Sequence, residues 1–257
     1  MADIPGIEFI IFDKGKGRAA YGDIRRHLKG RQFDVALCMH ASMRVNRIYR
    51  TIDTPIRLGY DRKRARDLQW LFTNQRIAAN DGQHVLDAMM SFAHHIGVPE
   101  RELRWDIPIG ETNRAFARDA TGNGPVLAIS PCSSQRIRNF RNWSADNYAA
   151  AANHARRKFG CRIVLTGGPS ELEKDYGRKI TDLCGAETVN LIGKTSLKDL
   201  LAVLDAADVL ISPDSGPAHM ATAAGTPVIG LYATSNPARS GPYLSRDLTV
   251  NAYPDAV

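Results

Sequence analysis

The chain of 257 residues contains no run of apolar residues that approaches the roughly 18 needed to cross a bilayer as a helix. Its start, residues 1–5, has no basic stretch followed by an apolar one, so the sequence shows no signal peptide. It has only four cysteines, far apart and without a C-x-x-C pair: Cys38, Cys132, Cys161 and Cys184. Such usage is typical of a reducing compartment, and we expect buried thiols in a cytoplasmic protein.

The motifs of common cofactor sites are also absent. There is no G-x-x-x-x-G-K-[ST], which excludes a P-loop, and Gly15-Lys16-Gly17 lacks the third glycine of a dinucleotide-binding turn. No H-E-x-x-H or C-x-x-C indicates a metal site, and no Asp-x-Asp indicates a sugar transferase that anchors a diphosphate through a divalent cation. The pair His94-His95 lies in an apolar helical pattern and is expected to be structural. We therefore expect no metal and no cofactor.

Positive charge is in excess, with 34 Lys and Arg against 27 Asp and Glu and a net charge of +7. The basic residues cluster at 44–66 and 136–141. Such an excess favours nucleic acid, phosphorylated substrates or an anionic membrane face, although solubility alone is an alternative. Because no nucleic-acid motif or interleaved aromatic residues accompany the clusters, we expect no nucleic-acid partner.

Short apolar runs alternate with helical patterns, which predicts an α/β chain with parallel sheets. The first half offers strands at 7–12, 35–39 and 56–60, and helices at 21–29 and 83–96. Glycines and prolines between 108 and 125 indicate a seam, so we divide the chain into domains 1–110 and 111–257. The second domain predicts a doubly wound unit with strands at 126–130, 162–166, 189–192, 209–212 and 228–232, and helices at 144–159, 171–183, 196–206 and 217–224.

The most informative segment is Asp214-Ser215-Gly216-Pro217-Ala218-His219, where an apolar strand ends and a helix begins at once. Free amides at a helix N-terminus bind anions, and Gly216 lets the backbone approach a phosphate without a side chain in the way. Asp214 would orient the turn or accept from a ligand hydroxyl, and His219 lies one turn along the helix. An ordinary capped helix with a core histidine is the alternative.

Three further strand ends carry residues suited to phosphate or sugar. Ser133 and Ser134 follow the strand at 126–130, and Arg136, Arg138 and Arg141 come just after them. Arginine binds phosphate through two parallel hydrogen bonds, which suits a diphosphate leaving group. After the next strand, Glu171 is a candidate acceptor for ribose hydroxyls or simply favourable charge in the first turn of a helix. The loop at 193–197 would border a base pocket.

Together, the runs 212–219, 221–227 and 231–237 resemble the C-terminal signature of glycosyltransferase family 9, the ADP-heptose:lipopolysaccharide heptosyltransferases. The likeness covers nearly the whole chain, loosely at 33–36 and 59–61 and well around Trp143. It implies a GT-B fold of two Rossmann-like, doubly wound domains, with the donor on the second domain and the acceptor on the first, N-terminal one, which is incomplete here. The implied activity is inverting, metal-independent transfer of heptose from ADP-heptose to the lipopolysaccharide inner core.

The resemblance also implies roles for individual residues. Asp214, Ser215, Gly216 and His219 match the donor-binding turn, Ser133 and Ser134 match hydroxyl residues near the diphosphate, and Glu171 matches a ribose-binding acid. Arg141 stands where the family often has a lysine on the diphosphate. The acceptor, core oligosaccharide on lipid A, is anionic and membrane-anchored, so Arg62, Lys63, Arg64 and Arg66 are candidates for its phosphates. A cytoplasmic enzyme, peripheral on the inner face of the inner membrane, is expected.

Two departures from the family pattern limit these expectations. The family's first strand and its Gly-Asp loop, whose aspartate is thought to act as general base, have no counterpart, and neither has the final helix. The chain is therefore expected to be truncated at both ends, and no residue is assigned as the base. A family 9 transferase that uses another nucleotide sugar and an inactive fragment that binds nucleotide or glycolipid are the alternatives.

Overall fold

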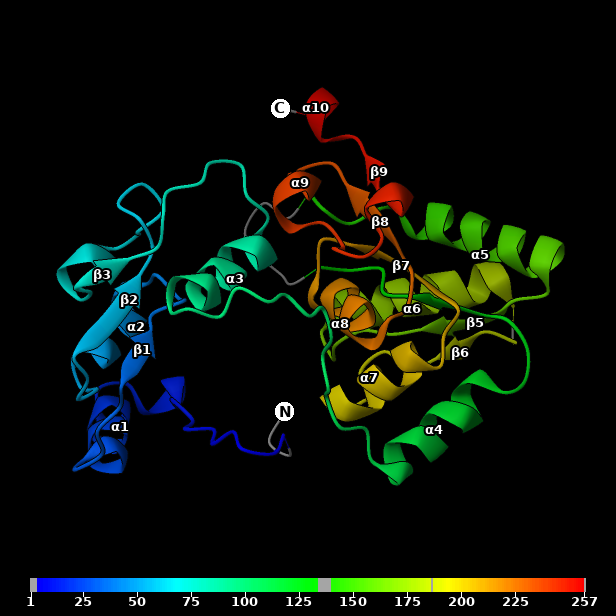
Figure 1. Cartoon of the computed structure of the whole chain (residues 1–257). Helices are drawn as coiled ribbons and strands as arrows, with labels where there is room; N and C mark the ends of the chain where they lie inside the picture. Colours follow the sequence, from blue (N-terminus) through cyan, green and yellow to red (C-terminus); the bar gives the residue numbers. More distant parts are fainter. Residues whose placement is uncertain (1–3, 134–139, 186, 257) are drawn as a thin grey trace. The chain divides into compact units, whose positions relative to one another are not determined.

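The computed structural model describes residues 4–133, 140–185 and 187–256. The chain forms two compact units, Met1–Leu103 and Arg104–Val257, each built around a parallel sheet (Figure 1). The α/β class predicted from the sequence is confirmed. None of the helices that the structure describes is long and apolar enough to cross a membrane.

The first unit contains a three-stranded sheet in the order β1-β2-β3, with all neighbours parallel. Its strands are β1 Val35–Leu37, β2 Ile56–Gly59 and β3 Gln75–Arg76, and its α-helices are α1 Ala19–Leu28, α2 Met43–Tyr49 and α3 Val85–His95. Side chains of β1 alternate between two small cores, since Ala36 packs with Tyr49 of α2 whereas Leu37 packs with Phe92 of α3. The two helices therefore cover opposite faces of the sheet.

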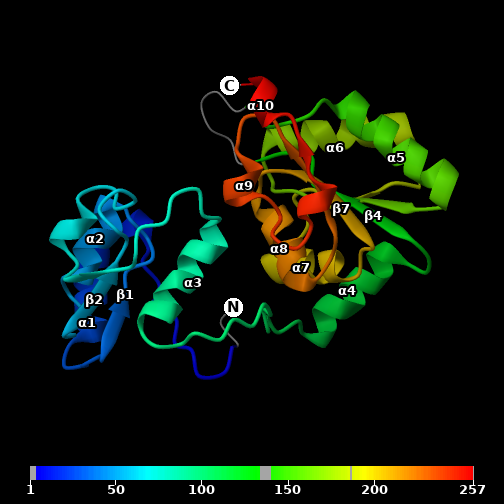
Figure 2. The same ribbon diagram turned by 45° about the horizontal axis from the view of Figure 1, so that its top comes forward.

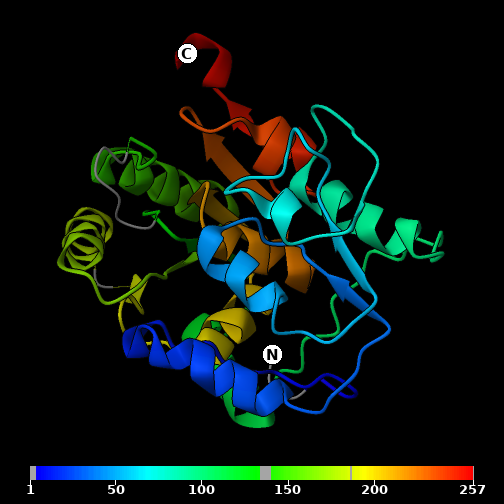
Figure 3. The same cartoon turned by 90° about the vertical axis from the view of Figure 1, so that its left-hand side faces the viewer.

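The prediction of a strand at 7–12 is wrong. This segment forms no strand and is drawn as a dark-blue coil in Figures 1 and 3. Ile7, Phe9 and Ile11 of this segment are exposed, Ile11 to 84%. β-Branched and aromatic residues favour a strand only where a neighbouring strand offers hydrogen bonds, and β1 pairs with β2 alone among the described strands.

The second unit is a six-stranded parallel sheet in the order β6-β5-β4-β7-β8-β9. The strands are β4 Val126–Ile129, β5 Arg162–Leu165, β6 Val189–Asn190, β7 Val209–Pro213, β8 Val228–Tyr232 and β9 Val250–Asn251. The α-helices are α4 Glu111–Thr121, α5 Ala145–Phe159, α6 Glu171–Cys184, α7 Leu197–Asp205, α8 Gly216–Ala224, α9 Pro237–Ser240 and α10 Tyr253–Ala256. The predicted strands and helices between 126 and 232 are thus confirmed to within a few residues.

Helix α4 was missed, because its flanking glycines were interpreted as a seam. Gly110 is the N-cap residue of α4, and Gly122 closes its C-terminus with a φ of 64°. Ala117 and Ala120 give the helix a buried face of small side chains that packs on α7. The glycines therefore mark the two ends of a helix rather than a linker.

Two hydrophobic cores lie on opposite faces of the larger sheet. Val126 and Ala128 of β4 face α4, α7 and α8, whereas Leu127 and Ile129 face α5 and α6. Figure 2 shows α5 and α6 on one side of β4 and β7, and α4 and α7 on the other. Each large side chain buried this way contributes about 1.5–3 kcal/mol to folding. Because β4 contributes side chains to both cores, it holds the two helical layers on the sheet.

Serine caps fix where the helices of this unit begin. Ser144 caps α5 and Ser196 caps α7, the latter through a reciprocal pair with Asp199. The Ser196 hydroxyl accepts from the amide of Asp199 at 3.1 Å, and the Asp199 carboxylate accepts from the amide of Ser196 at 3.0 Å. At the other end of the next helix, Gly225 takes the left-handed conformation at a φ of 85°.

Ser196→Ala is expected to lower the free energy of unfolding by about 1 kcal/mol, because it removes the acceptor for one amide and the donor to Asp199. Urea unfolding of the purified protein measures this. Leu197→Ala, which truncates the neighbouring and 76% exposed side chain, is the control and should stay within about 0.5 kcal/mol of wild type. Equal losses from both substitutions would contradict the capping role.

Candidate functional site

The candidate site lies where the order of the larger sheet reverses. From β4 the chain proceeds outward through β5 to β6, and it then returns to place β7 on the other side of β4. The loops after β4 and β7 consequently leave the same edge of the sheet in opposite directions, and in open α/β sheets such a reversal forms the crevice in which ligands bind. The backbone register Ile129↔Ile211 sets the two loops side by side.

An ion pair joins these two loops. Nη1 of Arg141, from the loop after β4, lies 3.2 Å from Oδ2 of Asp214, which follows β7, and it also donates to the Asp214 carbonyl oxygen at 3.5 Å. The side chains are 31% and 13% exposed, so the pair is partly shielded from water. Asp214 thus positions Arg141 at the crevice, and Arg141 compensates a carboxylate that would otherwise repel an anion there.

The N-terminus of α8 lacks the side-chain cap that its neighbours have. Ser215 occupies the N-cap position, but its hydroxyl pairs with the hydroxyl of Ser212 at 2.7 Å and makes no capping bond. By contrast, serines cap α5, α6 and α7 through their hydroxyls. The first amides of α8 therefore have no side-chain acceptor. Gly216 is exposed, and the space where a side chain would stand at this position is empty. This combination gives an electropositive turn beside Arg141.

Direct contacts connect the loops along the sheet edge. The Ser130 and Thr166 hydroxyls hydrogen-bond across β4 and β5, and the amide of Gly193, after β6, donates to the Gly167 carbonyl oxygen at 3.0 Å. With the Arg141–Asp214 pair, four consecutive loops are linked. Gly193 needs its φ of 73° and lies so close to Pro169 that a side chain there would crowd the backbone. The predicted convergence of the four βα loops at one edge is observed.

Of the two predicted diphosphate serines, the structure describes Ser133 and not Ser134. Ser133 is buried, and its amide donates to Oδ1 of Asn142 at 2.9 Å, which folds the loop back toward Arg141. Ser134, Arg136 and Arg138 lie outside the described residues. Sequence reasoning missed Asn142, for which the position next to Trp143 was the one available signal.

Two acids near the glycine loop have different contacts. Glu171 pairs with Lys174 at 2.9 Å, and its side chain is 81% exposed. That hydrogen bond lowers the pKa of Glu171. Glu173 instead accepts from the amide of Gly168 at 2.7 Å and from the Ser170 hydroxyl at 2.6 Å, so Glu173 shapes the loop. Sequence reasoning missed Glu173, although the Ser170-x-x-Glu173 spacing of a capping box was a signal that could have found it.

The other predicted donor residue, His219, lies on α8 and is exposed. Tyr232 of β8, which the sequence did not single out, lies on the protein side of the site and donates to the Ser240 carbonyl oxygen at 3.0 Å. Burial raises the pKa of Tyr232, and the nearby Asp214 carboxylate adds to this effect. The Tyr232 hydroxyl therefore stays neutral and links β8 to α9.

The predicted acceptor cations follow β2 in the first unit and are not equivalent. Arg62 lies over the Trp70 ring at 5.6 Å, and Lys63 pairs with Asp81, while Arg66 is exposed. Arg64 is 20% exposed and pairs with Asp61. It also donates to Oε1 of Gln83 at 2.8 Å and to the Ala78 carbonyl oxygen at 2.7 Å. The contacts of Arg64 make it a structural link, whereas Arg62, Lys63 and Arg66 remain accessible to a ligand.

Arg64→Ala is expected to lower the free energy of unfolding by about 1–3 kcal/mol, because it removes the side-chain donor to Oδ2 of Asp61, to Gln83 and to the Ala78 carbonyl oxygen. Arg66→Ala, which removes the same charge from an exposed position nearby, is the control and should cost less than about 0.5 kcal/mol. Thermal and urea unfolding compare the two. An Arg64→Ala protein as stable as the Arg66→Ala protein would contradict the structural role.

The same pair predicts a pH dependence. Burial is the largest single effect and raises the pKa of Asp61, but the hydrogen bond and charge of Arg64, together with hydrogen bonds from the amides of Lys63 and Arg64, outweigh it, so the net pKa is lowered. The stabilisation is therefore present above the unfolded-state pKa of about 4 and is lost as the pH falls through the lower folded-state value. Wild type should lose stability more steeply than Arg64→Ala below about pH 4, which unfolding at stepped pH measures.

Among the residues that the structure describes, no group of three or more His, Cys, Asp or Glu side chains is arranged to hold a metal ion. In the same part of the chain the four cysteines are free; Cys38, Cys132 and Cys184 are buried, as expected, whereas Cys161 is only partly buried. Burial raises the pKa of Cys132, near the site, to about 12. Its thiol is consequently protonated and inert at neutral pH.

The profile of glycosyltransferase family 9 (heptosyltransferase) matches residues 21–255. A lipopolysaccharide core heptosyltransferase, OpsX, from Haemophilus influenzae is 39% identical over 254 residues, which is 98% of this chain and 72% of that protein. A crystal structure of a family 9 glycosyl transferase from Veillonella parvula matches with a TM-score of 0.80 at 23% identity, over 98% of this chain and 72% of that one. The E. coli heptosyltransferase WaaC with ADP matches with a TM-score of 0.72 at 20% identity, over 91% and 70% of the two chains.

Two α/β units, each with a parallel sheet, are features of the GT-B class of glycosyltransferases, and the similarity to solved structures confirms that fold. The chain belongs to glycosyltransferase family 9, the heptosyltransferases. The family resemblance noted in the sequence is thereby confirmed.

Proposed function

We propose that this chain transfers heptose from ADP-heptose to the inner core of lipopolysaccharide, with inversion and without a metal ion. The observation that carries the proposal is the electropositive turn at the switch point, where Arg141 is held by Asp214 next to the uncapped start of α8. The relative from H. influenzae, a lipopolysaccharide core heptosyltransferase by name, supports the choice of reaction. The E. coli heptosyltransferase described with ADP supports the choice of nucleotide.

The turn suits a diphosphate leaving group. The amides of Ser215, Gly216 and Ala218 and the guanidinium of Arg141 would donate to the phosphate oxygens, with His219 one turn further along. Ser133 and Ser134 would add hydroxyls on the β4 side, and Glu171 would accept from the ribose. Cationic and helix-terminal donors stabilise the charge that grows on a departing ADP, which is the role a divalent cation fills in other transferases.

The reaction follows as a direct displacement. An acceptor hydroxyl attacks the anomeric carbon, the bond to the diphosphate breaks, and ADP leaves with both electrons of that bond while a base takes the hydroxyl proton. The residues assigned to this chain serve the leaving group, and none is assigned as the base. Attack from the face opposite the diphosphate inverts the anomeric centre.

The acceptor would be the lipid A-linked core oligosaccharide. Its phosphates suit Arg62, Lys63 and Arg66, which follow β2 and are exposed. Arg64 contributes mainly by holding that loop in place. Because this acceptor is anchored in a bilayer, the protein would work in the cytoplasm, peripherally on the anionic inner face of the inner membrane. Nucleic acid is not a proposed partner.

The test is release of ADP when the protein is incubated with ADP-heptose and a truncated lipopolysaccharide acceptor. Release that requires both substrates is expected. Arg141→Gln should weaken ADP binding roughly ten- to hundredfold, because hydrogen bonds from a charged donor contribute about 1.5–3 kcal/mol. Arg157→Gln, which removes the same charge from an exposed position on α5, is the matched control and should change ADP binding less than twofold.

Each outcome separates the alternatives. ADP binding without transfer would identify a nucleotide-binding protein that lacks activity, and transfer from a different nucleotide sugar would identify another donor. Equal effects of Arg141→Gln and Arg157→Gln would remove the diphosphate role from Arg141. Absence of ADP binding, measured by calorimetry, would overturn the donor site itself.

A further inference from the structure

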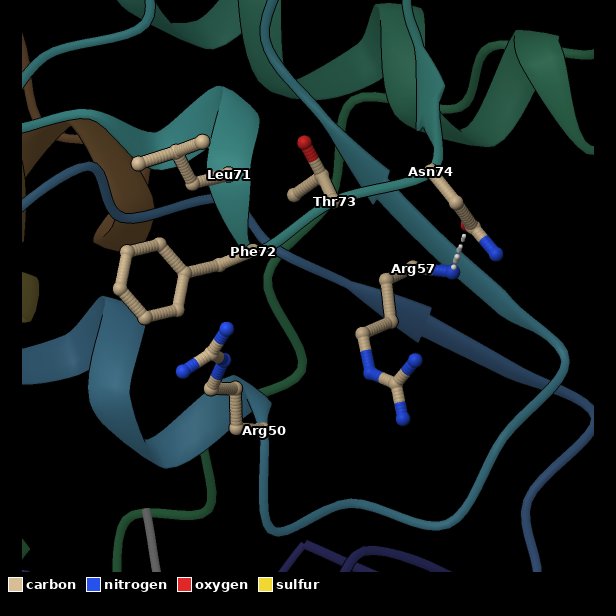
Figure 4. Close-up of a pocket in the computed structure, with 6 residues that line it drawn as sticks. All are labelled: Arg50, Arg57, Leu71, Phe72, Thr73 and Asn74. Atoms are coloured by element: carbon tan, nitrogen blue, oxygen red, sulfur yellow. Dashed lines mark hydrogen bonds between the residues drawn. The ribbon is translucent and has the colours of Figure 1, made fainter.

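A second concave site lies in the first unit, at the amino ends of its strands. A pocket of about 360 Å³ is lined by Arg50, Arg57, Leu71, Phe72, Thr73 and Asn74 (Figure 4). Arg50 directly follows α2, Arg57 is the second residue of β2, and residues 71–74 lead into β3. Strands β2 and β3 are parallel, so this pocket lies at the opposite edge of the sheet from the basic loop at 61–66.

Arg57 is held in place by the backbone around it. Its Nε donates to the Tyr49 carbonyl oxygen at 3.1 Å, and its Nη2 donates to the Ile52 carbonyl oxygen at 2.7 Å. Its own amide donates to Oδ1 of Asn74 at 2.8 Å, the contact drawn in Figure 4. These bonds fix the guanidinium, while its Nη1 has no hydrogen-bond partner in the described part of the chain. A donor fixed in this way binds a ligand at little cost in side-chain entropy.

Arg50 supplies a second cation to the same pocket. Its guanidinium carbon lies 5.1 Å from the centre of the Phe72 ring, an arrangement in which the ring orients the charge. Within residues 4–133, 140–185 and 187–256 the Arg50 side chain makes no hydrogen bond and no ion pair. Its N–H groups are therefore available to an acceptor, unlike those of Arg64 in the loop at the other edge.

The charge in this pocket is not balanced. Two of the described lining residues are arginines and none is acidic. The side chains of Leu71 and Phe72 form an apolar wall, with Leu71 53% exposed. Two guanidinium groups match a phosphate monoester, which carries a charge of about −1.5 to −2 at neutral pH, better than a carboxylate with a single charge. The planar guanidinium group of arginine can also donate two parallel hydrogen bonds to two oxygens of one phosphate group.

We propose that this pocket binds a phosphate monoester group, as a site distinct from the donor turn of the second unit. Its occupant is either free phosphate or a phosphomonoester headgroup on a lipid, which share the chemistry that the two arginines recognise. The proposal does not depend on the transfer reaction, because it rests on the contacts of the first unit alone.

Calorimetric titration with inorganic phosphate tests the site, at constant ionic strength and with ADP present in excess to occupy the donor turn. Saturable binding is expected in wild type, at least tenfold weaker binding in Arg50→Ala, and a smaller loss in Arg50→Lys. Arg76→Ala removes an exposed arginine of the same unit that does not line the pocket and should change binding less than twofold. Circular dichroism of each variant establishes that it is folded.

Vesicles distinguish the two sources of the phosphate. Sedimentation with vesicles containing phosphatidic acid, compared with phosphatidylglycerol vesicles of matched charge, is expected to show a preference for phosphatidic acid that Arg50→Ala abolishes if the ligand is a headgroup. Binding of inorganic phosphate without that preference identifies free phosphate. Binding to neither, or equal losses in Arg50→Ala and Arg76→Ala, overturns the proposal. Because Arg50 lies outside the donor unit, these outcomes hold even if ADP does not bind.

Discussion

The parallel pairing of β4 with β7 is the constraint on which the second unit depends. It places a strand from the start of the unit beside one that is more than 80 residues further along the chain, and it reverses the direction in which strands are added. The crevice follows from this reversal rather than from any single side chain. Leu127, Ala128 and Ile129 align with Val209, Leu210 and Ile211, and this register delivers Arg141 and Asp214 to the same place.

The electrostatics of the crevice explains why an acid stands in a turn suited to anions. Asp214 alone would oppose a phosphate, but its partner Arg141 is the group that a phosphate needs. A long arginine side chain loses much rotamer freedom when it binds a ligand, and a carboxylate that already restrains it removes part of that cost. The Ser212–Ser215 hydroxyl pair has a related effect, because it draws Ser215 away from capping and leaves the α8 amides exposed to the crevice.

Much of the second unit could be predicted from the sequence, because local signals and the tertiary structure agree there. Strand β8 was placed at its observed bounds, and Ser144, Ser196 and Gly225 marked helix ends through chemistry that acts within four residues. Predictions failed where the decisive partner is distant or absent. The segment at 7–12 has strand-forming residues but no strand beside it, and α4 owes its place to packing on α7, about 85 residues away.

The candidate site was likewise predictable from the sequence only in part. The residue types and their spacing predicted Asp214 and Arg141 as site residues. The ion pair between them could be recognised only in the folded structure, which brings the two loops together. Sequence spacing alone did not separate exposed Glu171 from Glu173, or exposed Arg66 from Arg64, since only the observed contacts show which side chain supports a loop. The pocket around Arg50 is formed by residues at the end of α2, in β2 and in the segment before β3, so no single sequence motif predicts it.

The two-faced character of β4 also restricts how such a chain can vary in length. One inserted or deleted residue within the strand would exchange Val126 and Ala128 with the larger Leu127 and Ile129, and each helical layer would then meet side chains of the wrong volume. Length changes are therefore confined to the connections at the strand ends. The connection after β4 carries Arg141, so a change of side chain at that position alters the ligand site and leaves the packing of both layers as it is.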